Sequence, residues 1–180
     1  MRVIAGRFRS RRLRSAPGLA IRPTPDRLRE SLFSILAPRL EGALFLDGYA
    51  GSGAVGIEAL SRGAKHVIFI ERSPAAIGIL RANLDSLGVE EEAATVLRGN
   101  VVSLFANYHP DIAFIDPPYD DTRQYTTALL LLSTTTSGLL LAQHSSGFAL
   151  QDRYGTMLRT RVLKQGDNSI SFYEPSASIT

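Results

Sequence analysis

The sequence contains no cysteine among its 180 residues. This absence excludes a disulfide framework, a thiolate metal site and a cysteine nucleophile, so we predict no metal centre and a cytoplasmic location. Long apolar runs are also missing. Runs such as Ala128–Leu132 and Leu139–Ala142 are far shorter than the roughly 18 residues of a membrane-spanning helix. No apolar segment follows the charged N-terminus, so we expect neither a secretory signal nor a membrane partner.

Lysine is scarce, and arginine supplies nearly all of the positive charge. Half of the arginines fall within the first 29 positions, where Asp26 is the single acidic residue, whereas acidic residues outnumber basic ones in the rest of the chain. Arginine side chains match phosphate geometry, so a basic extension on a mildly acidic body indicates a polyanionic partner. The simpler interpretation is a solvated surface segment.

Residues 1–23 are therefore predicted to form a basic N-terminal arm, and residues 24–180 the main domain. Short β segments are expected at Arg2–Ala5 and Arg11–Arg14 around a turn. The candidate RNA-binding residues are Arg7, Arg9, Arg11, Arg12, Arg22 and Arg27.

The main domain alternates apolar strands with amphipathic helices, which predicts an α/β fold with a parallel sheet covered by helices on both faces. The expected parallel strands lie at 43–46, 66–71, 95–97, 111–115 and 139–142. The C-terminus differs, because Met157–Lys164 and Ser169–Tyr173 flank a Gly-Asp turn and predict an antiparallel hairpin. Dinucleotide-binding domains usually end with another parallel strand instead.

Three helices carry clear boundary signals. The first is expected to begin with Thr24 as N-cap and Pro25 at the first helical position, and to end at Pro38. A second helix over 54–62 should stop at Gly63, and a third should run from a Ser-Pro cap at 73–74 to a glycine at 88.

A glycine-rich loop, Gly51-Ser52-Gly53, follows the first strand, and acidic residues stand at two strand ends. Asp47 precedes the loop and would repel a pyrophosphate, but it would attract the cationic groups of S-adenosylmethionine. Glu71 ends the second strand, where a carboxylate can accept hydrogen bonds from both ribose hydroxyls. The simpler interpretation is that both carboxylates bond local backbone.

The tetrapeptide Asp116-Pro117-Pro118-Tyr119 follows the strand at 111–115 and supplies the four candidate catalytic residues. Two prolines fix the backbone rigidly at the strand end. Asp116 and the Pro117 carbonyl can then accept the two hydrogens of a planar exocyclic amine, and Tyr119 offers a face on which a flipped base can stack. The alternative is a tight turn with an aromatic plug.

These residues give the chain a resemblance to the bacterial small-subunit (16S) ribosomal RNA guanine-N2 methyltransferases, the RsmD-like family. The similarity extends from Met1 to about Glu174. It includes the stretches Arg2–Arg9, Arg22–Glu30, Ala50–Gly53, Glu58–Ala64 and Asp116–Tyr119.

The resemblance implies the seven-stranded S-adenosylmethionine-dependent methyltransferase fold. It also implies transfer of a methyl group to a guanine amine in ribosomal RNA or an assembling subunit. We expect the protein to be a monomer. The cofactor-binding residues carried over are Asp47, Tyr49, Gly51, Ser52, Gly53, Glu71, Arg72, Asn100, Val101 and Asp116. The chain departs from the family pattern at Gly48 and Tyr49, where leucine and phenylalanine are usual, at Asn100, where aspartate is usual, and at Gln143-His144, where an acidic residue is common.

Other functions remain open at this point. The same tetrapeptide serves adenine-N6 methyltransferases acting on DNA or RNA. A glutamine methyltransferase would have asparagine at position 116, and a NAD-dependent dehydrogenase would explain the glycines and Glu71 but not Asp116 or the arginines. A non-catalytic RNA-binding assembly factor would keep the fold and lose the chemistry.

Overall fold

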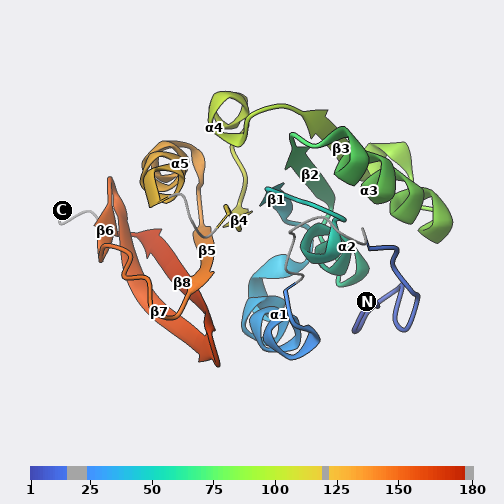
Figure 1. Cartoon of the computed structure of the whole chain (residues 1–180), viewed down its shortest axis with the longest axis horizontal. Helices are drawn as coiled ribbons and strands as arrows, with labels where there is room; N and C mark the ends of the chain where they lie inside the picture. The colour runs from blue at the N-terminus through green and yellow to red at the C-terminus, as the bar shows by residue number, and fades with distance from the viewer. Residues whose placement is uncertain (16–23, 119–121, 177–180) are drawn as a thin grey trace.

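The computed structural model describes residues 1–15, 24–118 and 122–176. Its strands form one sheet in the order β3-β2-β1-β4-β5-β8-β7-β6 (Figure 1). The strands are β1 (Leu44–Gly48), β2 (His66–Glu71), β3 (Ala94–Arg98), β4 (Ile112–Ile115), β5 (Leu139–Ser145), β6 (Arg153–Tyr154), β7 (Met157–Gln165) and β8 (Asn168–Pro175). The first five are mutually parallel, and β6, β7 and β8 are antiparallel to their neighbours. The predicted α/β class and C-terminal hairpin are confirmed, and the two-residue β6 adds an eighth strand.

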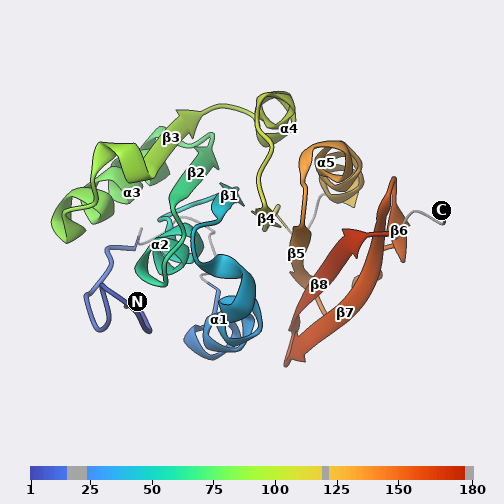
Figure 2. The same ribbon diagram turned by 180° about the vertical axis from the view of Figure 1, so that it is seen from behind.

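Helices cover both faces of this sheet, as the alternating pattern predicts. The helices are α1 (Asp26–Leu40), α2 (Ala54–Ser61), α3 (Pro74–Leu87), α4 (Val101–Leu104) and α5 (Thr122–Thr135), with 3-10 turns η1 (Glu91–Ala93) and η2 (Phe105–Asn107). Side chains of α1, α2 and α3 share one hydrophobic cluster with the sheet, and those of α4 and α5 share another. Figures 1 and 2 show α1 and α2 on the face opposite α4 and α5.

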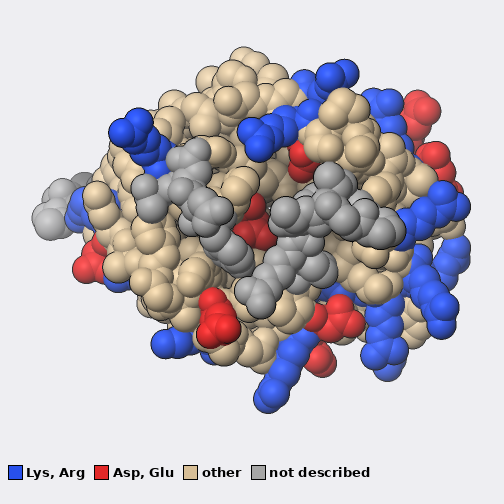
Figure 3. Space-filling model, viewed as in Figure 1, with Lys and Arg blue, Asp and Glu red and all other residues tan. Residues whose placement is uncertain are grey.

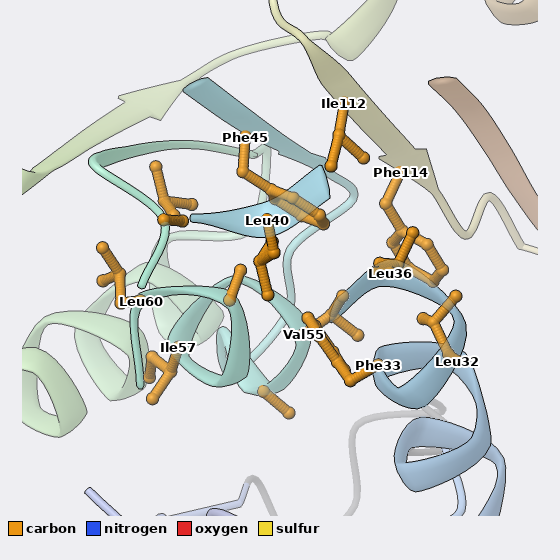
Figure 4. Packing of buried hydrophobic residues seen from close by; sticks show 14 of the residues in the cluster. Leu32, Phe33, Leu36, Leu40, Phe45, Val55, Ile57, Leu60, Ile112 and Phe114 are labelled. Atoms are coloured by element: carbon orange, nitrogen blue, oxygen red, sulfur yellow. The ribbon is translucent and has the colours of Figure 1, made fainter. Parts of the chain in front are cut away.

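The larger cluster fixes the position of α1 and α2 against the central strands. Figure 4 shows Phe33 and Leu36 of α1 beside Phe45 of β1 and Phe114 of β4, with Val55 of α2 next to them. Phe33 and Phe45 stack with ring centroids 6.4 Å apart. Each fully buried side chain of this size contributes about 1.5–3 kcal/mol through burial, so the cluster holds the loops at the strand ends in place.

Two details of α1 differ from the prediction. Pro25 occupies the N-cap position, and Thr24 lies one residue outside the helix with its hydroxyl bonded to Gln143 at 2.9 Å. Thr24 was therefore wrongly predicted as the cap, because a tertiary partner takes its hydroxyl. Pro38 does not end the helix, since the last turn continues to Leu40, which is anchored by burial in the core. The predicted ends of α2 and α3 at Gly63 and Gly88 are confirmed.

The N-terminal segment, residues 1–15, packs against the domain. Val3, Phe8 and Leu13 join the large hydrophobic cluster. Glu58 of α2 accepts hydrogen bonds from the backbone N–H groups of Ile4 (2.8 Å) and Ala5 (3.0 Å). The two predicted strands reduce to a single antiparallel bridge between Arg2 and Arg12. The N–H groups of Val3 and Ser10 still bond across the two segments, but those of Ile4, Ala5 and Phe8 bond side chains of α2 and interrupt the ladder. A domain boundary at residue 23 stays a prediction.

None of the helices in the described ranges combines the length and the apolar character that crossing a membrane would require.

Candidate active site

The predicted site residues gather at the carboxyl edge of the five parallel strands. Asp47 lies near the end of β1, Glu71 ends β2, and Asp116 directly follows β4. Strand order reverses beside β1, whose neighbours are β2 and β4. Ligands in open α/β sheets bind at such a reversal point, outside the carboxyl ends of the strands. Three carboxylates from separate strands thus meet where the fold favours a ligand.

Asp47 is buried, with 2% of its surface exposed. Its Oδ2 accepts a hydrogen bond from the backbone N–H of Gly56 at 2.8 Å. Burial raises the pKa of Asp47 to about 7; the Gly56 hydrogen bond opposes this rise, and the charge of Glu71 adds to it. Its Oδ1 has no hydrogen-bond partner among the described residues. A cationic ligand at that oxygen would relieve the unfavourable burial of the charge.

Glu71 bonds the surrounding backbone with both oxygens. Oε2 accepts from the N–H of Gly51 at 2.9 Å, and Oε1 accepts from the N–H groups of Arg72 and Ser73, both at 2.8 Å. Asp47 and Glu71 therefore both bond local backbone groups, as the simpler interpretation of the sequence expects. Each carboxylate oxygen can accept more than one hydrogen bond, so these contacts leave capacity for ribose hydroxyls. They also fix the glycine loop to the end of β2.

The glycine loop has a tightly constrained backbone. Tyr49 has φ +65°, Gly51 φ +56° and Gly53 φ +82°, all in the left-handed region that disfavours side chains. A side chain at Gly53 would be strained at this φ, and its Cβ atom would lie 2.2 Å from Cδ1 of Leu80, which would have to shift. The partly exposed Ser52 is held through its carbonyl, which accepts a bond from Asn83 at 3.0 Å. The loop is thus a rigid platform at the start of α2.

Three further predicted cofactor-binding residues lie on the same edge. Arg72 follows β2 and is exposed. Asn100 is the N-cap of α4, where its side-chain oxygen accepts from the N–H of Val102 at 3.0 Å. Val101 begins α4 and is buried against the second hydrophobic cluster. Their contacts with an adenine ring remain predictions.

Asp116 begins the proline corner and is partly exposed. Burial raises its pKa to about 8, and the charge of Asp47 adds to this rise. Since Asp47 of β1 pairs with Phe114 of β4, the first residue of the tetrapeptide follows β4 on the same edge as the predicted cofactor carboxylate. The hydroxyl of Tyr125 contacts the carbonyl of Pro117 at 3.2 Å, and Pro118 is exposed. The fourth residue, Tyr119, lies outside the described residues.

Gln143, which the sequence interpretation left without a role, bonds Asp116 directly. Its Nε2 donates to Oδ2 of Asp116 at 3.1 Å, and its Oε1 accepts from the Thr24 hydroxyl at 2.9 Å. The only signal in the sequence was its place at the end of the fifth parallel strand. The neighbouring His144 bonds Ser145 and Ser171, and burial lowers its pKa.

The candidate RNA-binding arginines within the described ranges are exposed. Arg7, Arg9, Arg11, Arg12 and Arg27 all have exposed side chains, whereas Arg22 lies outside the described residues. Arg11 donates to the carbonyl of Ser86 near the C-terminal end of α3 at 2.6 Å, and Arg7 lies over the ring of Phe8. Figure 3 shows basic side chains densest at the lower right, where Figure 1 places the N-terminal segment. Among the residues described here, no cluster of acidic or histidine side chains suits a metal ion.

The N-terminal segment is tied to the glycine loop by one buried side chain. The Oδ1 of Asn83 accepts from the N–H of Arg14 at 2.8 Å, and its Nδ2 donates to the carbonyls of Arg14 (3.1 Å) and Ser52 (3.0 Å). The exposed arginines are therefore carried on a segment that contacts the predicted cofactor loop.

Comparison with known proteins agrees with this geometry. Residues 1–174 match the family described as conserved hypothetical protein 95. The chain is 34% identical to the Bacillus subtilis protein named "Putative rRNA methyltransferase YlbH", over 97% of this chain and 98% of that protein. It is 39% identical to ribosomal RNA small subunit methyltransferase D of Haemophilus influenzae over 66% of this chain and 64% of the other. The solved structure named "Putative methyltransferase yhhF", from Escherichia coli, superposes with a TM-score of 0.85 at 32% identity and covers 99% of each chain.

Proposed function

The chain belongs to the conserved hypothetical protein 95 family, the RsmD-like family, and on this premise we propose that it methylates the exocyclic N2 amine of a guanine in small-subunit ribosomal RNA, using S-adenosylmethionine. The observation that carries the proposal is the meeting of Asp47, Glu71 and Asp116 at the carboxyl edge of the sheet, beside a proline corner.

The residues of this edge fit S-adenosylmethionine. The unpaired Oδ1 of the buried Asp47, described above, suits a ligand ammonium group, and a phosphate there would be repelled. Glu71 retains lone pairs for ribose hydroxyls, and the rigid loop over Gly51–Gly53 lets the backbone approach the ligand closely. When bound, S-adenosylmethionine supplies an electrophilic methyl group and a good leaving group.

Asp116 and the Pro117 carbonyl would orient the substrate amine. Each accepts one N–H of the planar amine, so the nitrogen lone pair is turned toward the methyl carbon. The amine gains the methyl group and releases one proton. The ionised form of Asp116 can accept that proton, and its pKa of about 8 makes it a stronger base than an ordinary carboxylate. Positioning therefore provides most of the catalysis.

The basic N-terminal segment would hold the RNA. Arg7, Arg9 and Arg12 are exposed with no ion pair among the described residues, so they are available for phosphates. Their segment reaches the glycine loop through Asn83, so bound RNA would lie close to the methyl donor. An rRNA substrate would place the protein in the cytoplasm, where ribosomes assemble.

The test is transfer of label from S-adenosylmethionine to RNA. Small subunits and free ribosomal RNA from cells lacking the activity are incubated with the protein, and the digested nucleosides are identified by mass spectrometry. N2-methylguanosine is expected in the wild type and not with Asp116→Ala.

Other products would identify a different activity. N6-methyladenosine would replace the guanine assignment with the adenine alternative. RNA binding without transfer, together with no heat on titration with submillimolar S-adenosylmethionine, would show a non-catalytic assembly factor.

A further inference from the structure

The carboxylate of Asp116 is held from one side only. Gln143 contacts Oδ2, and Oδ1 has no hydrogen-bond partner in the part of the chain that the structure describes. Gln143 itself is almost fully buried, with 1% of its surface exposed. A buried amide at this place needs partners for both of its ends, because an unsatisfied amide group costs about 1–3 kcal/mol. The structure provides them with Asp116 and Thr24.

The two partners fix which end of the amide faces Asp116. A carboxylate only accepts hydrogen bonds, whereas a threonine hydroxyl both donates and accepts. When Asp116 is ionised, the Nε2 group must therefore face it, and the Thr24 hydroxyl donates to Oε1 at 2.9 Å. The backbone of Gln143 is fixed as well, because its carbonyl accepts from the Tyr125 hydroxyl at 2.8 Å.

The same tyrosine reaches the proline corner. Its hydroxyl lies 3.2 Å from the Pro117 carbonyl, farther than from the Gln143 carbonyl. One hydroxyl hydrogen favours the shorter contact, and a carbonyl oxygen has two lone pairs, so the Pro117 carbonyl keeps room for a substrate N–H. Gln143 of β5 and Tyr125 of α5 thus contact the two predicted amine acceptors, Asp116 and the Pro117 carbonyl. Each acceptor can still accept a further hydrogen bond.

We propose that Gln143 is a positioning residue for Asp116: its amide occupies Oδ2 and leaves Oδ1 for the substrate amine, while Thr24 holds the opposite end of the amide in place. This inference rests on the proposed methyl transfer. The amide of Gln143 is neutral, so it can donate to Asp116 at any pH.

Within the described ranges, the charged groups shown to act on this contact are acidic. Asp47 of β1 acts directly on Asp116, and Glu71 of β2 acts on Asp47; the groups from α5 and from the residue before α1 are the neutral hydroxyls of Tyr125 and Thr24. An N–H donor stabilises the ionised carboxylate against these neighbours. Removing the donor should raise the pKa of Asp116, and replacing it with a carboxylate should raise that pKa further.

The first measurement needs no substrate. The carboxyl carbon of Asp116 is titrated by NMR in the wild type, Gln143→Met and Thr24→Val. We expect the midpoint to rise by about one pH unit in Gln143→Met and by less in Thr24→Val, with Thr24→Ser at the wild-type value. Ser171→Ala is the matched control, because it removes an equally buried hydrogen bond, to His144, away from Asp116. An unchanged midpoint in Gln143→Met would overturn the proposal.

The second measurement uses methyl transfer. We expect kcat to fall about 10- to 100-fold in Gln143→Met, with the KM for S-adenosylmethionine within about twofold of the wild type. Gln143→Glu should lose activity as pH rises through neutrality, because two adjacent carboxylates can share a proton only at lower pH. A KM effect alone, or a wild-type pH profile for Gln143→Glu, would contradict the assigned role. If the wild type transfers no methyl group, the proposed function fails, and the NMR titration still decides whether Gln143 controls Asp116.

Discussion

Replacing Asp47 with asparagine should stabilise the ligand-free protein while weakening its binding of S-adenosylmethionine. Asparagine keeps the shape of the side chain and an oxygen that can accept from the Gly56 N–H. It removes the charge that burial makes costly. Because burial raises the pKa of Asp47 from 3.8 to about 7, folding favours the protonated form relative to the unfolded chain.

The sign and size follow from proton linkage. A carboxyl group whose pKa is raised by folding contributes no penalty below its unfolded pKa, and stability is lost as pH rises toward the folded value. At 1.36 kcal/mol per pKa unit, the cost of ionising Asp47 is roughly 4 kcal/mol at pH 8 and roughly 1.5 kcal/mol at pH 5. These values are ceilings, because a folded protein relaxes around a buried charge.

Urea unfolding of the wild type and Asp47→Asn at both pH values measures the effect. The variant should gain stability at pH 8 and gain clearly less at pH 5. Asp85→Asn is the matched control, because it makes the same chemical change at an exposed position on α3 and should alter stability by less than about 0.5 kcal/mol. A loss of stability in Asp47→Asn at pH 8, or an equal gain at both pH values, would show that Asp47 is not an electrostatic cost.

Three further outcomes test the site. Binding of S-adenosylmethionine should tighten as pH rises through about 7, since the cation requires ionised Asp47. Calorimetry in buffers of different ionisation enthalpy would show proton release on binding, and an affinity that does not change with pH would count against this contact. Asp116→Ala should lower the rate of methyl transfer at least about 100-fold with little change in RNA affinity in a filter-binding assay, because the carboxylate orients the amine and does not grip the RNA; full activity would refute its role. Changing Arg7, Arg9 and Arg12 together to glutamine should weaken RNA binding. The slope of log affinity against log salt should become shallower by about 0.9 for each lost phosphate contact, and an unchanged slope would assign these arginines to solvated surface.

Substitution is a better test of the basic segment than truncation. The exposed arginines alternate with Val3, Phe8 and Leu13, which lie in the hydrophobic core. Deleting residues 1–14 would remove this buried surface as well as the charge, so loss of RNA binding could reflect a damaged fold. Glutamine at the arginine positions changes the charge and leaves the packing in place.

The sequence by itself determined the features that depend on local chemistry. Alternation of apolar strands with helices specifies a parallel sheet, since each element must bury one face against the next. The glycine spacing, the carboxylates at strand ends and the proline corner then place Asp47, Glu71 and Asp116 on one edge, because parallel strands end together. The hairpin turn at Gly166 and the helix ends at Gly63 and Gly88 are local as well.

Only the tertiary structure decided which side chains bond across the fold. Thr24 has the sequence signature of a helix cap, yet its hydroxyl serves Gln143, 119 residues away in the chain. Glu58 and Asn83 attach the N-terminal segment to α2 and α3, so residues that appear to be a free basic arm are part of the core. Such pairings depend on how the helices pack against the sheet, and no periodicity or spacing along the chain encodes them. Gln143 acquires its place beside Asp116 in the same way, because β4 and β5 pair in register only after the chain between them has folded.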